Sequence, residues 1–261
     1  MAKNVITAIL NITVYRKKDW VFLLGSMENN QLHKHYTIQV SIPVTGTLAL
    51  NNGKTERQLD KAVFIKPNVT HRLESSGNNL HLFFNPQSRI GMYLNSIIGE
   101  HDFFFNQDLV ADLIGYAQQT IEGKMTLGTL AQHIERHFEA STDFKTFEKR
   151  TDDRLLEVLD FLYTHRNRWV KAEECAQHIH LSKSRFLHFF KETTGSTFRR
   201  SQLWIRICES IGMLKEQGIS ETAFHYGFYD NAHYGRAFKE NLGFTPKAFV
   251  DSAVLYNRGD D

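Results

Sequence analysis

Residues 182–197, SKSRFLHFFKETTGST, and residues 230–245, DNAHYGRAFKENLGFT, repeat one pattern within a chain of 261 residues. Both segments share an aromatic pair four residues apart, a Lys-Glu pair, a glycine and a threonine at a constant offset of 48 residues: Phe186, Phe190, Lys191, Glu192, Gly195 and Thr197 match Tyr234, Phe238, Lys239, Glu240, Gly243 and Thr245. Such internal similarity indicates two copies of one supersecondary unit.

Each copy has the features of a helix-turn-helix unit. Ser182 and Asp230 are good helix N-caps, and Gly195 and Gly243 stand where a glycine ends a helix. Aromatic side chains four residues apart share one helix face and can enter a core. The pattern therefore predicts two helix-turn-helix units, each with a second helix that starts directly after its N-cap.

The outward positions of these second helices suit DNA. An α-helix fits the major groove, where arginine pairs with guanine and asparagine with adenine. The stretch 182–206 carries six Lys or Arg against Glu192 alone, a local charge of +5, whereas the second copy is less basic. A solvated helix face is the alternative, but duplication together with basic outward residues favours DNA. We predict that ten residues bind DNA: Lys183, Ser184, Arg185, His188, Arg199, Arg200, Asn231, His233, Arg236 and Lys239.

The sequence around the repeat is helical. Amphipathic segments follow one another over 154–165, 171–179, 198–217, 220–227 and 246–252, so residues 154–261 are expected to form an all-α domain. The polar stretch 139–153, EASTDFKTFEKRTDD, has no sustained period and is interpreted as a linker.

The first half of the chain has a different pattern. Short β-type runs at 36–42, 47–50, 63–66 and 80–84 are separated by turn residues and predict a small antiparallel barrel or sandwich over about 5–85. Two amphipathic helices follow within about 88–138. Their apolar stripes suit either a dimer seam or packing on the barrel, and the sequence does not separate these alternatives. The fold class is therefore α+β, with two domains.

Composition limits the class of protein. The chain is 41% hydrophobic and 23% charged with a net charge of +2, which is typical of a folded protein. Cys175 and Cys208 are far apart in sequence and are expected to be free thiols in the cytoplasm. No apolar run approaches the roughly 18 residues of a membrane span, and the N-terminus lacks the pattern of a signal peptide.

The sequence resembles the AraC/XylS family of bacterial transcription regulators over roughly 152–250. The most specific segment is 223–246, AFHYGFYDNAHYGRAFKENLGFTP, which contains the family's Gly227, Phe228, Asp230, Arg236, Phe238, Lys239, Gly243 and Pro246. The first unit departs from the family at His188, often arginine, and at Phe198, often proline. The resemblance implies that Thr197–Leu214 is a connecting helix that sets the two recognition helices about one duplex turn, roughly 34 Å, apart.

The resemblance also implies the role of residues 1–138. His33-Lys34-His35, Gly46 and residues 67–71 resemble, in outline, the family's cupin-like effector-binding and dimerisation domain. The implied function is a sequence-specific DNA-binding transcription regulator, expected to be an activator, that responds to a small molecule or another signal. The implied partners are double-stranded promoter DNA, RNA polymerase and a second copy of the chain bound through helices within 106–138.

A cluster of histidines supports the competing class, a metal-dependent cupin-type enzyme or sensor. His33, His35, His71 and Gln39 have nearly the spacing with which cupins hold a divalent ion. However, Gln39 replaces a carboxylate, and an unbroken strand with Tyr36 inside would turn His33 and His35 away from the core. A β-bulge would reverse that face. We therefore predict no metal, no cofactor and no catalytic residue.

Overall fold

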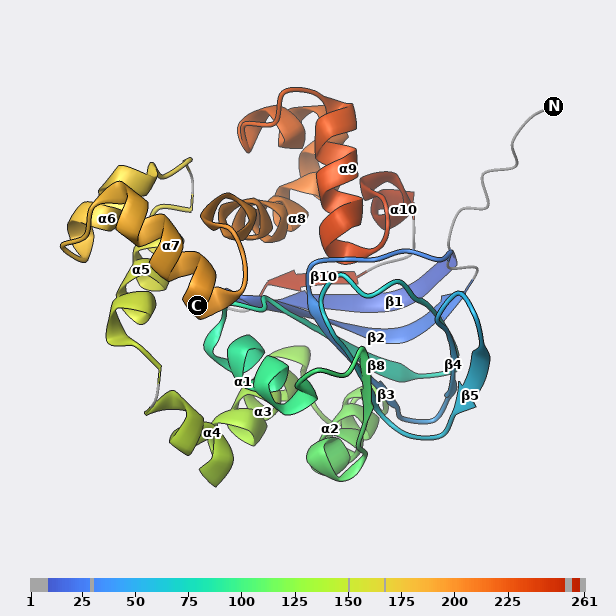
Figure 1. The fold of residues 1–261 in the computed structure, drawn as a ribbon. Coiled ribbons are helices and arrows are strands. Elements are labelled where there is room, and N and C mark those ends of the chain that lie inside the picture. Colours follow the sequence, from blue (N-terminus) through green and yellow to red (C-terminus); the bar gives the residue numbers. More distant parts are fainter. Residues whose placement is uncertain (1–8, 29–30, 150, 167, 252–254, 259–261) are drawn as a thin grey trace.

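The computed structural model describes residues 9–28, 31–149, 151–166, 168–251 and 255–258 (Figure 1). The strands are β1 (Ile9–Arg16), β2 (Trp20–Glu28), β3 (Ile38–Pro43), β4 (Thr47–Asn51), β5 (Glu56–Leu59), β6 (Val63–Ile65), β7 (Arg72–Ser76), β8 (Asn79–Phe84), β9 (Phe103–Phe105) and β10 (Leu255–Arg258). The α-helices are α1 (Arg89–Ile98), α2 (Ala111–Ile121), α3 (Leu127–Glu139), α4 (Thr142–Glu148), α5 (Asp153–Thr164), α6 (Ala172–His178), α7 (Lys183–Thr194), α8 (Phe198–His225), α9 (Asn231–Leu242) and α10 (Pro246–Asp251). The predicted α+β class is confirmed.

Two sheets form the N-terminal domain. The larger has the strand order β10-β1-β2-β8-β3-β6-β9, and the smaller has the order β5-β4-β7. Their paired strands are antiparallel except for β1 and β10, which are parallel. The predicted hairpin turn lies between β4 and β5, where Gly53 has a φ of 87° and its amide donates to Asn51 Oδ1.

The larger sheet is buried on both faces, which explains the continuous apolar run of β2. Trp20 and Phe22 pack among residues of the helices, whereas Val21 and Leu23 point into the space between the sheets. Successive strand residues face opposite sides, so a strand that is covered on both sides has apolar residues on both.

The helices that follow the barrel pack their apolar stripes against the barrel of the same chain. Leu113 of α2 and Ile134 and Phe138 of α3 are buried in one cluster with Phe84 of β8. Of the two uses left open by the sequence, packing on the barrel is the one observed. A dimer through these helices would need their outward faces.

Two segments differ from the sequence-based expectations. Residues 139–153, interpreted as a polar linker, include α4, whose Phe144 is buried at an edge-to-face distance of 5.3 Å from Tyr93 of α1. The chain after residue 154 is not wholly helical, because β10 adds a strand to the edge of the N-terminal sheet beside β1. Isolated phenylalanines and a four-residue strand give too weak a periodicity to be recognised.

The C-terminal helices follow the predicted order. The long helix α8 is interrupted at Gly218, where φ is 78° and ψ is 178°, so residues 198–217 form the connecting helix and residues 219–225 begin the second unit. In Figure 1, α8 lies between α7 and α9. Among the described residues, no helix is both long and apolar enough to cross a bilayer.

The two domains pack against each other through polar contacts. Arg16 of β1 forms an ion pair with Glu209 of α8, with 2.9 Å between Nη1 and Oε1. Asn85 donates to the Tyr163 hydroxyl of α5, and Gln87 donates to the Thr194 hydroxyl at the end of α7. The C-terminal half is therefore tied to the N-terminal domain at several points.

Candidate nucleic-acid interface

Each helix-turn-helix unit has the caps and the buried face that the repeat predicts. The Ser182 hydroxyl accepts from the amide of Arg185, and the Asp230 carboxylate accepts from the amide of His233. Gly195 and Gly243 end α7 and α9 in the left-handed conformation. The aromatic pairs Phe186/Phe190 and Tyr234/Phe238 are fully buried. Both helices are thus held by their buried aromatic face, and their opposite face is exposed to solvent.

The turn of the second unit is supported by a buried arginine. Arg206 of α8 donates to the carbonyl of Tyr226 and lies 4.4 Å from the ring centroid of Trp169. Gly227 follows with a φ of 69°, and a Cβ there would lie 3.1 Å from Arg206 Nη1. Arg206 therefore positions the second unit and is buried away from any DNA.

The predicted contact residues of the first unit lie on the outside. Lys183, Ser184, Arg185, His188 and Arg199 are exposed. Lys183 forms an ion pair with Glu173 of α6, and His188 lies 3.0 Å from Glu192 one turn later. These exposed pairs contribute little to stability and can be exchanged for phosphate contacts.

Arg200 is oriented differently from the other predicted contact residues. Its guanidinium lies 4.8 Å from the ring centroid of Tyr36, and its Nη2 donates to Asn68 Oδ1 at 3.0 Å. Both partners belong to the N-terminal domain. Arg200 thus contacts the other domain, a role that local charge cannot distinguish from a phosphate contact.

In the second unit, Asn231 and Arg236 are exposed on α9, and His233 is half-buried against Phe228. Asn231 donates to the Ser220 hydroxyl at 2.7 Å, which orients its amide. Lys239 is also exposed but lies in the last turn of the helix. Asn231 is the first residue of α9, and Arg236 lies in its second turn. The N-terminal part of a recognition helix usually makes the base contacts, so both residues lie nearer to that part than Lys239 does.

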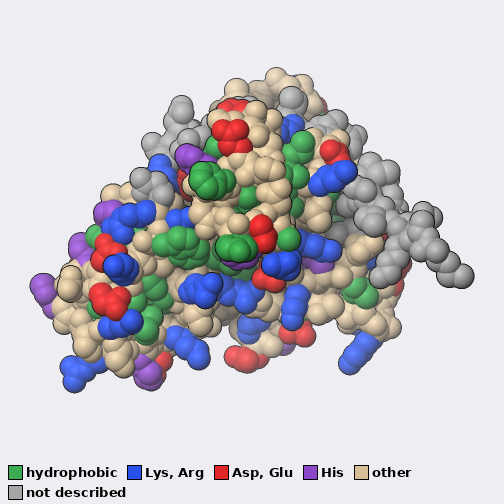
Figure 2. All heavy atoms as spheres, turned by 90° about the horizontal axis from the view of Figure 1, so that it is seen from above, with side chains coloured by type: hydrophobic (Ala, Val, Ile, Leu, Met, Phe, Trp, Pro, Cys, Tyr) green, Lys and Arg blue, Asp and Glu red, His purple; other side chains and the backbone are tan. Residues whose placement is uncertain are grey.

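Sequence analysis missed two aromatic side chains beside these residues. Phe224 is 83% exposed and Tyr229 is 92% exposed, on either side of the turn that leads into α9. Figure 2 views the molecule from above and shows Lys and Arg side chains spread across this face with hydrophobic side chains among them. Aromatic residues near a turn usually enter a core, so the sequence carried no signal for their exposure.

Comparisons with known proteins agree with this geometry. A family model described as a helix-turn-helix domain matches residues 175–252. The chain is 26% identical over 234 residues to YidL of Escherichia coli, described as an uncharacterized HTH-type transcriptional regulator, and the match covers 85% of this chain and 74% of that protein. The chain therefore contains a helix-turn-helix domain and is similar to HTH-type transcriptional regulators, in agreement with the resemblance to the AraC/XylS family that the sequence carries.

Further similar proteins are also bacterial. The chain is 28% identical over 103 residues to the probable transcription factor PqrA of Proteus vulgaris, a match that covers 38% of this chain and 84% of that protein. The crystal structure of ToxT from Vibrio cholerae O395 has the same fold with a TM-score of 0.54 and 15% identity, over 90% of this chain and 98% of that one.

The helix α9 is docked on the N-terminal domain. The amide of Tyr36 donates to the carbonyl of Glu240 at 3.0 Å, and a Cβ on Gly243 would lie 2.6 Å from His33 Nε2. The lower end of α9 meets the N-terminal sheets in Figure 1. The start of α9 is thus presented outward while its end is anchored.

A histidine cluster lies at this anchor point. His33 and His71 are joined by a β-bridge, and potential ligand atoms of His33, His35 and His71 all lie within 4.8 Å of one another. Burial lowers the pKa of all three imidazoles, to about 4 for His35, so the rings are neutral at pH 7.

The prediction that strand alternation turns His33 and His35 away from the core is wrong. Strand β3 begins at Ile38, so the alternation of residues 38–42 does not extend back to the histidines. His35 is buried with its ring 5.6 Å from that of Phe83, and His33 is half-buried beside it. The irregular approach to β3 brings together side chains that a continuous strand would separate.

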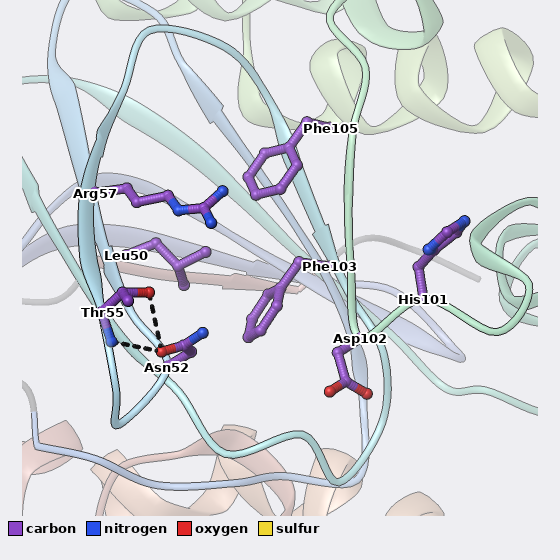
Figure 3. A pocket seen from close by; sticks show the side chains of 8 residues that line it. All are labelled: Leu50, Asn52, Thr55, Arg57, His101, Asp102, Phe103 and Phe105. Atoms are coloured by element: carbon purple, nitrogen blue, oxygen red, sulfur yellow. Dashed lines mark hydrogen bonds between the residues drawn. The ribbon is translucent and has the colours of Figure 1, made fainter.

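A cavity of about 260 Å³ opens between the β4–β5 hairpin and β9. Figure 3 shows Arg57 and Leu50 on one side of it, facing Phe103 and Phe105 on the other, while His101 and Asp102 point away. An apolar wall with one guanidinium fits a small apolar molecule that carries a negative group.

Proposed function

We propose that this regulator binds DNA by inserting the first two turns of α7 and α9 into successive major grooves. The observation that carries the proposal is the pair of capped helices whose aromatic faces are buried and whose polar faces are exposed. Asn231 and Arg236 have the chemistry to read adenine and guanine, with His233 beside them. Phe224 and Tyr229 are suited to contacts with thymine methyl groups and sugars.

The first unit supplies general affinity in this proposal. Lys183, Arg185 and Arg199 are exposed cations, and Ser184 and His188 add donors to the same face. Neutralising phosphates releases counterions, so the affinity for DNA is expected to fall steeply with salt concentration. Arg200, which contacts Tyr36, is expected to contribute less than the other arginines.

The test is substitution of Arg236 by alanine. A binding site is first selected from random duplexes with the full-length protein, and its Kd is measured by fluorescence anisotropy. Loss of a bidentate arginine contact costs about 1–3 kcal/mol, which corresponds to a Kd increase of about 5–150-fold. The base preference at one position should relax at the same time.

The matched control is Lys54→Ala, which removes an exposed cation from the β4–β5 turn, remote from α9. Its affinity should stay within about twofold of the wild type. If Arg236→Ala kept both the affinity and the base preference while circular dichroism showed an intact fold, the assignment of α9 as the base-reading helix would be refuted.

We also infer that the cavity beside Arg57 receives the controlling small molecule. The chemistry of its lining favours an aromatic or aliphatic carboxylate. Binding of 2-naphthoate, followed by its fluorescence, should weaken at least about fivefold in Arg57→Gln and stay unchanged in Arg199→Gln. Equal binding by the wild type and Arg57→Gln would exclude this cavity as the anion site.

Activation, contact with RNA polymerase and self-association stay predictions within this proposal. Transcription with purified polymerase from a template that carries the selected site should increase when the protein is added. Size-exclusion chromatography with and without that DNA tests for a dimer formed through the outward faces of α2 and α3. The buried free thiols of Cys175 and Cys208 agree with the expected cytoplasmic location.

A further inference from the structure

We propose that His33, His35 and His71 bind a divalent transition-metal ion through their Nε2 atoms, with Gln39 Oε1 as a fourth ligand, and that the ion is coupled to the docking of α9. The four side chains come from the approach to β3, from β3 itself and from the residue before β7. The metal site is independent of the DNA-binding proposal, whereas its coupling to α9 affects function only through that proposal.

The hydrogen bonds of the three imidazoles favour this use of Nε2. The Nδ1 of His33 lies 2.7 Å from the Gln31 carbonyl, that of His35 lies 3.2 Å from the Thr37 carbonyl, and that of His71 lies 2.9 Å from the Val69 carbonyl. A carbonyl oxygen only accepts, so the Nδ1 of His33 and that of His71 carry the proton and their Nε2 atoms present lone pairs. The Nδ1 of His35 also lies 2.8 Å from the Thr37 hydroxyl, which is able to donate to it. Metal-binding histidines are oriented by this kind of second hydrogen bond.

Gln39 completes the set of donors. Its Oε1 lies 2.8 Å from the Nε2 of His35, the distance of a hydrogen bond in which Nε2–H donates, and 3.3 Å from the Nε2 of His71. An ion bound among these atoms would replace that hydrogen bond by bonds to the metal. The amide nitrogen of Gln39 donates to the Ser41 hydroxyl, which lies 2.9 Å from His81 Nδ1. This buried chain holds the Gln39 oxygen toward the histidines.

The dimensions of the cluster fit a first-row metal after a small contraction. A tetrahedral zinc ion has Zn–N distances of about 2.0–2.1 Å, which requires nitrogens about 3.3 Å apart. Because the present separations reach up to 4.8 Å, the rings must move inward by about 1 Å. Imidazole ligands favour zinc, iron, nickel or copper over magnesium.

The position of the cluster links it to α9. His33 Nε2 faces Gly243 so closely that a Cβ there would lie 2.6 Å away, and the amide of Tyr36, three residues later, donates to the carbonyl of Glu240. Contraction of His33 onto an ion changes the surface on which the end of α9 rests. Two sites that share a contact in this way must influence each other's affinity equally.

The experiment uses the full-length protein, stripped with a chelator and titrated with Zn²⁺ and Co²⁺ by calorimetry and visible absorption. We expect one equivalent to bind, a cobalt spectrum of low coordination number, and no binding of Mg²⁺. His71→Gln should weaken zinc binding more than about 100-fold, because even an outer-shell partner is worth about 10–100-fold. Gln39→Glu should bind zinc more tightly, since it supplies a carboxylate.

The matched control is His101→Gln, which removes an exposed histidine outside the cluster and should bind zinc as the wild type does. Thermal unfolding distinguishes loss of ligand from loss of fold, because zinc should raise the melting temperature of the wild type and of His101→Gln but not of a folded His71→Gln. Absence of stoichiometric binding by the wild type, or equal affinity in His71→Gln, would overturn the site.

The coupling is measured separately, as the DNA affinity of the stripped and the zinc-loaded protein. We expect these affinities to differ by at least about threefold in the wild type and to be equal in His71→Gln. Equal affinities of the two forms of the wild type would overturn the coupling but not the metal site. Absence of specific DNA binding in both forms would instead refute the DNA-binding proposal.

Discussion

The ion pair between Arg16 and Glu209 joins the two domains, and its contribution to the free energy of unfolding can be worked out from the structure. Arg16 is 2% exposed and Glu209 is 10% exposed, with 2.9 Å between their closest atoms. The Nε of Arg166 lies 3.4 Å from the same carboxylate oxygen. One carboxylate therefore faces two guanidinium groups across the boundary between β1 and α8.

Replacement of Glu209 by glutamine removes the negative charge and leaves two like charges facing each other. Breaking a buried pair in this way costs about 3–5 kcal/mol, a large share of the roughly 5–15 kcal/mol that stabilises a typical domain. The free energy of unfolding should fall by that amount in urea denaturation. Because the pair joins the two domains, the transition should also separate into two steps.

Two controls distinguish loss of a buried charge from loss of packing. The double variant Arg16→Met, Glu209→Leu replaces the pair by apolar side chains and should recover most of the stability, since Arg166 is already partly exposed to water. Asp160→Asn breaks the exposed pair with Lys18, whose carboxylate is 76% exposed, and should cost at most about 1 kcal/mol. A loss below about 1 kcal/mol in Glu209→Gln, or a double variant no more stable than it, would refute the argument.

Three further predictions follow from single positions. Phe238→Ala should destabilise the protein by about 3–5 kcal/mol in urea denaturation, because a fully buried aromatic side chain leaves a cavity. Gly227→Ala should cost about 1–2 kcal/mol and weaken DNA binding, since alanine is strained at a φ of 69°; unchanged stability would contradict this. Burial lowers the pKa of His81 to about 3, so stability that is complete above pH 6.5 should be lost as the pH falls toward 3, by about 1.4 kcal/mol per pH unit. His81→Gln should lack that component, and equal pH slopes in the two proteins would contradict it.

The sequence predicted the C-terminal half best because its signals are local. Caps such as Ser182 and Asp230, glycines that end helices, and aromatic residues four apart act within one or two turns. The break at Gly218 also falls between two segments that were predicted as separate helices. These features need no knowledge of what packs against them.

The parts that were missed depend on contacts distant in the sequence. The irregular segment before β3 lets His35 reach His71, although continuous alternation predicts the opposite orientation. Arg200 carries the positive charge expected of a phosphate contact, but its guanidinium lies against the ring of Tyr36. Neither outcome can be derived from local periodicity, because each depends on contacts between residues that are far apart in the sequence.

The same long-range contacts decide how the two recognition helices are spaced. The end of α7 is held by Gln87 at Thr194, and the end of α9 is held through Glu240 and Gly243. The connecting helix α8 is itself fixed to β1 by Glu209. The distance between the two helices is therefore set by the N-terminal domain as well as by α8. A change at any of these contacts would alter whether both helices fit successive grooves of one duplex, without any change in the residues that face the bases.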